Sequence, residues 1–359
     1  MEASIIDLLA EKNRIVIAGD DDQALYSQLR DASWDYIRAH YENGHYEIFE
    51  LPFCMRCPEV IVNAVNDVVL TARKCEKLDG RIDKPFRYYE PVKGEDSRRY
   101  PKIELVTTSV QRGNANYFGR YIEEGINAIP EEEVALAAEK HEPAALIIGS
   151  NPYRRQVEEY LSQVGLITAE QAPELSTRER GLEILAQNEK SNLGWRAILA
   201  EQDEDTAKAL VRLAAERGVP LFEVIPQNDR ESILREARGW AAKHGPQDAV
   251  DAGPLPTPKV KITSFEGSKG LSAQYVFIIG VHSGEMPRDA AAVQDIEICR
   301  FLVGMTRTKK RCSILVTKRF GEQTKKRSEF PNWIRPERFE EKRVDANYWR
   351  QSKKTAKQA

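Results

Sequence analysis

Short, almost continuously apolar runs recur along this chain of 359 residues and alternate with stretches of helical pattern. Strands buried on both faces of a parallel sheet have this pattern, because neither face meets water. Three of the runs end at Gly19, Gly149 and Gly280, and open α/β sheets bind their ligands at the carboxyl ends of strands. The pattern therefore predicts an α/β fold with a parallel sheet, whose strands include residues 15–18, 145–148, 275–279 and 313–316.

Helices are expected after several of these runs. Asn151 can cap a helix, Pro152 suits its first turn and Gly165 stops it. Pro58 opens another helix. The apolar face of this second helix is formed by Ile61, Val65, Val68 and Val69.

The middle of the chain has a different pattern. Residues 167–244 show helical periodicity alone, and the Gly/Pro-rich stretch 253–258 is typical of a linker. The α/β pattern resumes at Lys259. We therefore expect a small all-helical subdomain that is inserted into a larger α/β domain.

Composition narrows the class of protein. The chain is 41% hydrophobic and 30% charged, an ordinary globular balance, and no apolar run has the length that a membrane span needs. Its N-terminus lacks a basic and apolar leader, and its five cysteines do not suggest a disulfide framework. A reducing cytoplasm is the expected location.

Charge is unevenly distributed. The net charge is −3, yet residues 307–359 hold 17 Lys+Arg against 6 Asp+Glu, a local balance of +11 that leaves −14 for the rest. A basic segment with Trp333, Tyr348 and Trp349 can contact phosphates and stack on bases. The alternative is a solvated tail, which we favour for residues 352–359.

Four short motifs carry candidate chemistry. Residues 19–26 read GDDDQALY at the end of an expected strand. In this turn Gln23 can contact a γ-phosphate or an attacking water, and Tyr26 offers a ring for base stacking. The alternative is an acidic turn or an Asp-rich metal loop, although metal loops usually space their ligands.

The second motif is Arg56, which precedes the helix at Pro58. An arginine beside a helix N-terminus forms a phosphate-binding corner. The third, Ser264 to Leu271, contains Gly267, Lys269 and Gly270 between two expected strands. Its small residues let the backbone approach a ligand closely, and Lys269 adds a positive charge.

The fourth motif lies in residues 295–310, where Ile298, Leu302 and Met305 share one helical face. Thr306 and Arg307 come near the end of this helix. An arginine here can reach a transferring phosphoryl group across a domain interface, a role worth ~10³–10⁵ in rate. The alternative is a core helix with a cationic C-terminus.

Cys54 and Cys57 flank Arg56 in a C-x-x-C spacing. A zinc or redox pair has this spacing, and Cys75, His40 and His45 are near in sequence, but a second metal-binding pair is absent. Two buried thiols beside Arg56 are the favoured interpretation, and no metal is expected.

Taken in this order and spacing, the motifs resemble those of superfamily 1 DNA helicases of the UvrD/Rep/PcrA type, over about Ile5 to Lys318. The resemblance implies a RecA-like (P-loop NTPase type) parallel-sheet domain with a small inserted helical subdomain. In that family two RecA-like domains sandwich ATP. No GxxxxGK followed by Ser or Thr occurs in this chain, so the Walker A loop and the Mg²⁺ motif are expected upstream of Met1.

The resemblance also implies roles for single residues. Gln23 matches the glutamine that couples the γ-phosphate to DNA, and Tyr26 matches an aromatic residue that stacks on single-stranded DNA. Arg56 matches a γ-phosphate contact, and Arg307 matches the arginine finger of a Thr-Arg motif that begins at Thr306. Ser264 to Leu271 matches a motif at the interface of ATP and DNA.

Three positions depart from the family pattern. Ser272 stands in place of a glutamate that contacts the ribose, so that contact is in doubt. Glu266 replaces the common histidine. Gln28 and Leu29 follow where a second aromatic residue is usual, which predicts weaker stacking on DNA.

The resemblance divides the chain into four parts. Residues 1–49 would be a remnant of the first RecA-like domain. Residues 50–165 and 259–330 would form the second RecA-like domain, and residues 166–258 would hold the inserted helical subdomain with its linker. Residues 331–359 would be a basic tail.

The expected function is therefore the C-terminal part of an ATP-dependent DNA helicase, inactive as an ATPase alone. ATP and Mg²⁺ would serve the complete enzyme, and its partners would be single-stranded DNA and a segment or chain that bears the Walker motifs, with no membrane. The alternative is a non-catalytic module, derived from a helicase, that binds DNA or a repair partner. An unrelated α/β enzyme is disfavoured, since the sequence has no clustered histidines, nucleophile elbow or paired-carboxylate signature.

Overall fold

The computed structural model describes residues 6, 8–10, 13–23, 25, 34–112, 115–167, 177–200, 204–244 and 259–349. The chain divides into two compact units, which are treated separately below. The sheet unit comprises residues 1–25, 34–173 and 256–359. The helical unit comprises residues 26–33 and 174–255.

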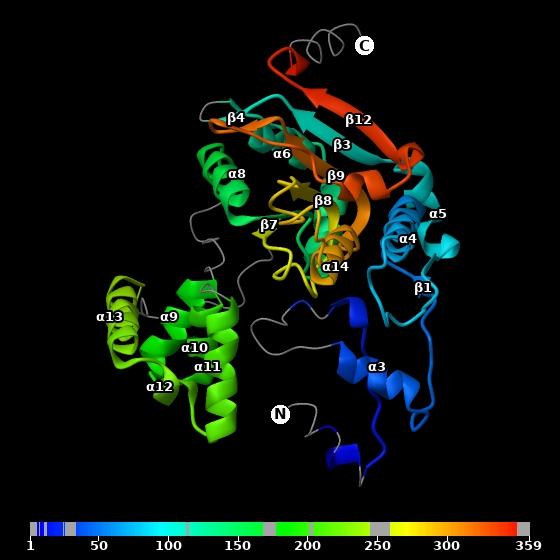
Figure 1. The fold of residues 1–359 in the computed structure, drawn as a ribbon. Coiled ribbons are helices and arrows are strands. Elements are labelled where there is room, and N and C mark those ends of the chain that lie inside the picture. Colours follow the sequence, from blue (N-terminus) through cyan, green and yellow to red (C-terminus); the bar gives the residue numbers. More distant parts are fainter. Residues whose placement is uncertain are drawn as a thin grey trace, which may run out of the picture. The chain divides into compact units, whose positions relative to one another are not determined.

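A six-stranded sheet forms the centre of the sheet unit (Figure 1). All of its neighbouring strands run parallel. In spatial order the strands are β12 (Phe339–Val344), β3 (Ile103–Thr108), β9 (Thr308–Thr317), β8 (Ala273–Ile279), β6 (Ala145–Gly149) and β7 (Val260–Thr263). The coarse prediction of an α/β fold on a parallel sheet is therefore confirmed.

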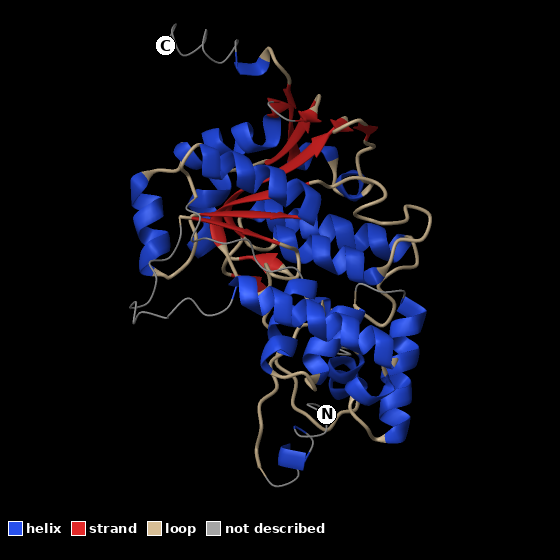
Figure 2. Cartoon of the chain, turned by 90° about the vertical axis from the view of Figure 1, so that its left-hand side faces the viewer, coloured by secondary structure: helices blue, strands red, loops and turns tan. Residues whose placement is uncertain are grey.

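Helices cover both faces of this sheet (Figure 2). On one face α4 (Glu59–Lys74) and α14 (Asp295–Met305) pack in a core with Leu146, Ile148 and Ile278. On the other face α6 (Tyr117–Asn127), α7 (Glu131–Glu139) and α8 (Asn151–Gln163) pack in a second core with Ile147 and Phe277. Successive strand residues therefore enter opposite cores, which explains why the strands are apolar throughout.

Smaller elements surround this three-layered core. They include α3 (Asp35–Glu42), α5 (Glu90–Arg99), the two-residue strands β1 (Phe53–Cys54), β2 (Arg87–Tyr88), β4 (Gln111–Arg112), β5 (Ala115–Asn116), β10 (Arg319–Phe320) and β11 (Gln323–Thr324), and the 3₁₀ turns η1 (Asp21–Gln23), η2 (Phe330–Trp333) and η3 (Pro336–Arg338). β1 pairs with β2 in parallel. Along the chain, β1 is followed by α4.

The helical unit contains five helices in its described part. They are α9 (Thr177–Gln187), α10 (Asn192–Leu199), α11 (Glu204–Arg217), α12 (Leu221–Val224) and α13 (Gln227–His244). Trp195 and Leu185 are fully buried in its own hydrophobic core. The helical pattern of the middle of the chain is thus realised, whereas its assignment as a helicase subdomain stays a prediction.

Several expected elements are found with small shifts. The runs at 145–148, 275–279 and 313–316 lie in β6, β8 and β9. In the helix that follows β6, Ser150 occupies the N-cap position without a side-chain capping hydrogen bond, and Asn151 is the first helical residue. Within the described helices, none has both the length and the apolar character that crossing a bilayer requires.

The prediction of a buried strand at residues 15–18 is wrong. The structure assigns no strand there, and Val16 is 97% exposed. An apolar run becomes a buried strand only when neighbouring strands pair with it, and among the described residues none does. The run instead leads into η1, which packs against α14.

The basic tail predicted from residue 331 is also corrected. Residues 339–344 form β12, which pairs with β3 over its whole length. Trp349 is only 5% exposed and lies under the Arg120 guanidinium, 4.0 Å from the ring centroid. The sheet unit therefore continues at least to this residue, whose ring is not free to stack on bases, and residues 350–359 lie outside the described part of the chain.

A buried carboxylate joins three strands at one side of the sheet. Glu104 of β3 is 3% exposed and forms ion pairs with Arg311 of β9 and Lys342 of β12. The hydroxyls of Ser313 and Tyr121 donate to it at 2.6 and 3.0 Å. Burial opposes its ionisation, but the Arg311 guanidinium and these donors hold the pKa of Glu104 below its usual value.

We predict that Glu104→Gln lowers the free energy of unfolding of the sheet unit by about 2–4 kcal/mol, since two cations lose their shared carboxylate. The exposed Glu340→Gln on β12 is the matched control and should cost less than about 0.5 kcal/mol. Hydrogen exchange of the β3 and β9 amides in urea measures both. The pKa of Glu104 is lower in the folded chain than in the unfolded chain. Its contribution to the free energy of unfolding is therefore complete above the unfolded pKa of about 4.3 and is lost as pH falls through the folded-state pKa. Equal exchange in both variants at pH 7 would contradict the prediction.

Candidate phosphate-binding site

Arg307 lies in the short connection between α14 and β9. It is 3% exposed, and its guanidinium is directed into its own unit. Nε donates to the Val303 carbonyl at 2.9 Å, Nη1 to the Leu271 carbonyl at 3.3 Å and Nη2 to the Thr306 hydroxyl at 3.1 Å. All three acceptors are neutral, so the structure holds the arginine in place without compensating its charge.

Arg56 approaches the same place from the loop between β1 and α4. Its Nη1 donates to the Thr306 carbonyl at 3.2 Å, and the Cys57 thiol donates to the same oxygen at 3.5 Å. Pro58 is the N-cap of α4, so both residues stand just before the first turn of a 16-residue helix. The structure thus brings Arg56 and Cys57 to Thr306, which is about 250 positions away in the sequence.

The two guanidiniums share an environment in which neither pairs with a described carboxylate. Burial and the nearby Arg56 charge lower the pKa of Arg307 to about 10, so it stays a cation at neutral pH. Among the described residues, neither arginine forms an ion pair with a carboxylate, whereas most of the half-buried arginines of the sheet unit do. Two neighbouring cations without a carboxylate partner form an environment that favours an anion such as phosphate.

The loop after β7 is a compact turn stabilised by its own side chains. The Ser264 hydroxyl accepts from the Gly267 amide at 3.0 Å, and the buried Ser268 hydroxyl donates to the Phe265 carbonyl at 2.7 Å. Gly270 has a φ of +85°, which glycine adopts without strain. This geometry leaves Lys269 exposed at the tip of the turn.

Lys269 connects this turn to the acidic motif. Its Nζ donates to the Gln23 carbonyl at 2.8 Å. The Gln23 side chain donates to Asp20 at 2.7 Å and is therefore occupied within its own turn. The contact brings the motif at residue 23 and the motif at residue 269 together through the Gln23 backbone, and the functional role of both motifs stays a prediction.

The three carboxylates of the acidic turn face cations rather than an open coordination site. Their oxygens lie within 4.8 Å of one another, a spacing that a metal ion could use. Lys84 contacts all three, Arg81 pairs with Asp22 at 2.7 Å and Arg38 pairs with Asp21 at 3.1 Å. Burial opposes ionisation of Asp20, but the Lys84 charge holds its pKa below the usual value. The cluster is therefore an ion-pair network that anchors the N-terminal segment, and the carboxylate oxygens that Mg²⁺ would need are occupied by cations.

Sequence reasoning missed the cations of this network. Three consecutive aspartates indicate that positive partners are needed, but Lys84 and Arg81 are about 60 positions away. No local spacing identifies them. The parallel pairing of β1 with β2 brings this loop back beside the acidic turn.

Other predicted residues are engaged with other partners or are not described. Tyr26 lies outside the described residues. Ser272 is buried and donates to Glu142 at 2.7 Å, and Glu266 pairs with Arg300 at 2.6 Å. The ribose contact that Ser272 put in doubt therefore gains no support.

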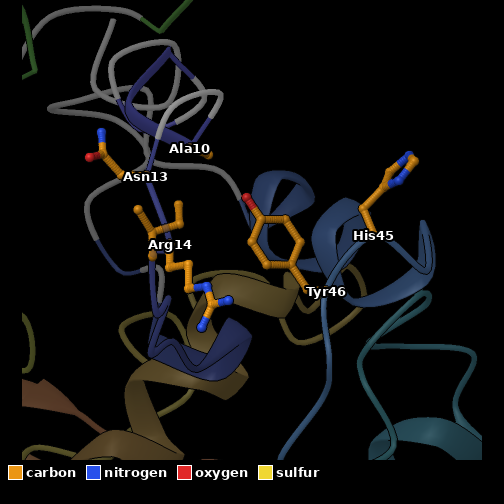
Figure 3. A pocket seen from close by; sticks show the side chains of 6 residues that line it. Ala10, Asn13, Arg14, His45 and Tyr46 are labelled. Carbon is orange, nitrogen blue, oxygen red and sulfur yellow. The ribbon is translucent and has the colours of Figure 1, made fainter.

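A hollow in the described surface is separate from these residues. It measures about 490 Å³ and is lined by Ala10, Asn13, Arg14, Ile15, His45 and Tyr46. Figure 3 shows the Arg14 and Tyr46 side chains approaching it from two segments of the N-terminal region. None of the candidate site residues lines it, so it plays no part in the site described above.

Comparison with known proteins adds no family assignment. No protein-family model matches the chain. No curated protein matches it either. The interpretation of the site therefore depends on its residues and their geometry.

We predict that Lys84→Ala loosens the N-terminal segment by about 1–3 kcal/mol, because three partly buried carboxylates lose a shared cation. Faster hydrogen exchange of α3 amides would show this, since Arg38 of α3 pairs with the same turn. Lys74→Ala, an exposed lysine of α4, should leave the exchange unchanged. Tight Mg²⁺ binding by the wild-type turn, lost in Asp21→Asn, would oppose the assignment of an ion-pair network.

Proposed function

We propose that this chain is the C-terminal part of a UvrD-like, ATP-dependent DNA helicase and that its sheet unit is a RecA-like domain. The single observation that carries the proposal is the convergence of Arg56 and Arg307 on Thr306 without a carboxylate partner. These are the residues for which the helicase resemblance implies contacts with the γ-phosphate. Only that resemblance predicted that the two arginines lie close together, because they are far apart in the sequence.

The electrostatics of the pair suit a polyphosphate. A phosphate oxygen accepts charge-assisted hydrogen bonds, which are roughly twice as strong as neutral ones. Arg307 donates at present to neutral oxygens, and each such bond contributes only about 1 kcal/mol net. A triphosphate terminus can therefore compete for the guanidinium, which would turn from its carbonyl partners toward the anion.

The chain supplies only part of what ATP hydrolysis requires. Positioning and metal charge account for most of the catalysis of phosphoryl transfer. The sequence has no Walker A motif, and the neighbouring aspartates at residues 20–22 are paired with cations. In our proposal a segment or chain that bears the Walker motifs supplies the phosphate-binding loop and the carboxylates that hold Mg²⁺. Arg307 and Arg56 then stabilise the γ-phosphoryl group, and the chain by itself does not turn over ATP.

The contact between Lys269 and Gln23 supports a coupling role. It links the turn that follows β7 to the turn that contains the γ-phosphate sensor of the proposal. A change at Gln23 on nucleotide binding would therefore reach residues 264–270, which the proposal assigns to the track of single-stranded DNA with Ser264, Gly267, Gly270 and Tyr26. Thr306 would transmit the state of the arginines to α14.

A second candidate is a non-catalytic module that binds DNA or a repair partner. The burial of Arg307 favours it, because an arginine that is 3% exposed and makes three hydrogen bonds within its own unit can be purely structural. The two candidates differ in whether the arginine pair binds a polyphosphate. The first experiment below separates them.

We expect inorganic tripolyphosphate to bind the chain, and Arg56→Ala to weaken binding about 10–100-fold, the value of one or two charge-assisted hydrogen bonds. Arg319→Ala removes an arginine that is 53% exposed by side chain and serves as control, with no change expected. Isothermal titration calorimetry measures the affinities. Arg307→Lys tests the second arginine with less loss of packing, and equal affinity in all variants would favour the non-catalytic module.

The purified chain is expected to show no ATP turnover, with or without single-stranded DNA, because the phosphate loop and metal carboxylates are absent from its sequence. A coupled assay of phosphate release measures this. DNA-stimulated turnover that disappears in Arg307→Ala would mean instead that the chain holds a complete nucleotide site.

A further inference from the structure

Two cysteines flank Arg56 at the centre of the candidate site. Cys54 ends β1 and is half-buried, whereas Cys57 is fully buried beside the start of α4. The Cys57 amide donates to the Cys54 sulfur at 3.4 Å, and the Cys57 thiol donates to the Thr306 carbonyl at 3.5 Å. The pair is therefore tied to both the arginine loop and the end of α14.

The loop before α4 already brings Cys54 close to Cys57. The Cys54 sulfur lies 3.4 Å from the Cys57 nitrogen, and a bond of about 2.0 Å between the two sulfurs needs a small further movement of the loop. Rotation of the Cys57 side chain away from Thr306 would bring the two sulfurs together. Only Met55 and Arg56 lie within the loop that the bond would close.

Cys54 has the surroundings of a nucleophilic thiol. The Cys57 thiol can turn its one proton from the Thr306 carbonyl to the Cys54 sulfur. This hydrogen bond, backbone donors and the Arg56 charge outweigh burial and lower the pKa of Cys54 to about 6. The same hydrogen bond and complete burial raise the pKa of Cys57, with Arg56 and Arg307 opposing that rise. A half-buried thiolate next to a buried thiol is the arrangement of an attacking and a resolving cysteine.

We propose that Cys54 and Cys57 form a reversible disulfide by exchange with a low-molecular-weight disulfide, and that this bond displaces Arg56 from Thr306 and weakens the phosphate-binding site. The bond itself is independent of the function proposed above, whereas its effect on phosphate binding rests on that function.

The exchange is balanced in atoms and electrons. The Cys54 thiolate attacks one sulfur of the small disulfide, forms a mixed disulfide and releases one small thiolate. Cys57 then loses its proton and attacks the Cys54 sulfur, which forms the intramolecular bond and releases the second small thiolate. The two protein thiols are oxidised, and one small disulfide is reduced to two small thiols.

Formation of the bond changes two contacts of Thr306. Its carbonyl loses the Cys57 thiol as a donor, because the sulfur no longer carries a proton. Arg56 lies between the bonded cysteines, so closure of the ring redirects its backbone and takes its Nη1 away from the same carbonyl. The state of the cysteine pair thereby sets the position of one of the two cations.

The bond is tested by peptide mapping after treatment with glutathione disulfide. Trypsin cleaves after Arg56 and so separates residues 39–56 from residues 57–73, each with one cysteine of the pair. We expect these peptides to be joined in the oxidised chain and released by reduction. A Cys75→Ser background removes the exposed thiol. Absence of the joined peptides, or linkage of Cys299 or Cys312 instead, would overturn the proposal.

The order of attack is tested with single substitutions. Cys57→Ser is expected to accumulate a glutathione adduct on Cys54, and Cys54→Ser is expected to accumulate none on Cys57. Alkylation of Cys54 should have its midpoint near pH 6, rising toward the ordinary value of about 8.5 in Cys57→Ala, which lacks the thiol donor. An adduct on Cys57 alone would contradict the assigned roles.

The effect on the site is tested with tripolyphosphate and the reduced and oxidised forms of one preparation. Oxidation should weaken binding by about 10-fold or more, the loss of one charge-assisted hydrogen bond, and reduction should restore it. The Cys54→Ser variant should be insensitive to the oxidant. Unchanged affinity on oxidation would overturn the switch, whereas no binding by the reduced chain would overturn the proposed function and the switch while leaving the peptide map to judge the bond.

Discussion

The parallel sheet requires cover on both of its faces, and this constraint organises the sheet unit. Six parallel strands offer two apolar surfaces, and each needs helices to exclude water. α4 and α14 satisfy this on one face, which places the start of the first helix beside the end of the second. The candidate site is a consequence of that packing, since Arg56 precedes α4 and Arg307 follows α14.

Thr306 connects the end of α14 to the segment that precedes α4. Its carbonyl, left free at the end of α14, accepts from Arg56 and from the Cys57 thiol, and its hydroxyl accepts from Arg307. A helix C-terminus with partial negative charge suits these cationic donors. Among the described residues no carboxylate pairs with these two arginines, and our proposal assigns them an anion from outside the chain.

The acidic turn at residues 20–22 differs from the arginine pair in its charge balance. There three carboxylates meet Lys84, Arg81 and Arg38, and their charges are compensated within the chain. Glu104 is compensated in the same way by Arg311 and Lys342. The charged clusters whose charges are compensated within the chain stabilise the fold. The arginine pair has no carboxylate partner among the described residues, and it is the cluster for which we propose a ligand.

The sequence by itself determined the elements whose patterns depend on local burial. The strands at 145–148, 275–279 and 313–316 and the helices after Pro58 and Ser150 could be predicted, because continuous apolar runs and helical periodicity report two-sided and one-sided burial directly. The grouping of Arg56, Thr306 and Arg307 was predicted only through a resemblance to a helicase family. Their contacts over 250 positions leave no trace in local spacing.

Tertiary structure alone decided the rest. Residues 15–18 have the pattern of a buried strand but no partner strand in the described chain, so their hydrogen bonds cannot form a sheet. Residues 339–344 are too polar to suggest a strand, yet pairing with β3 and the ion pair of Lys342 with Glu104 make them one. Whether a segment becomes a strand, and whether a charge is compensated, depends on neighbours that only the folded chain supplies.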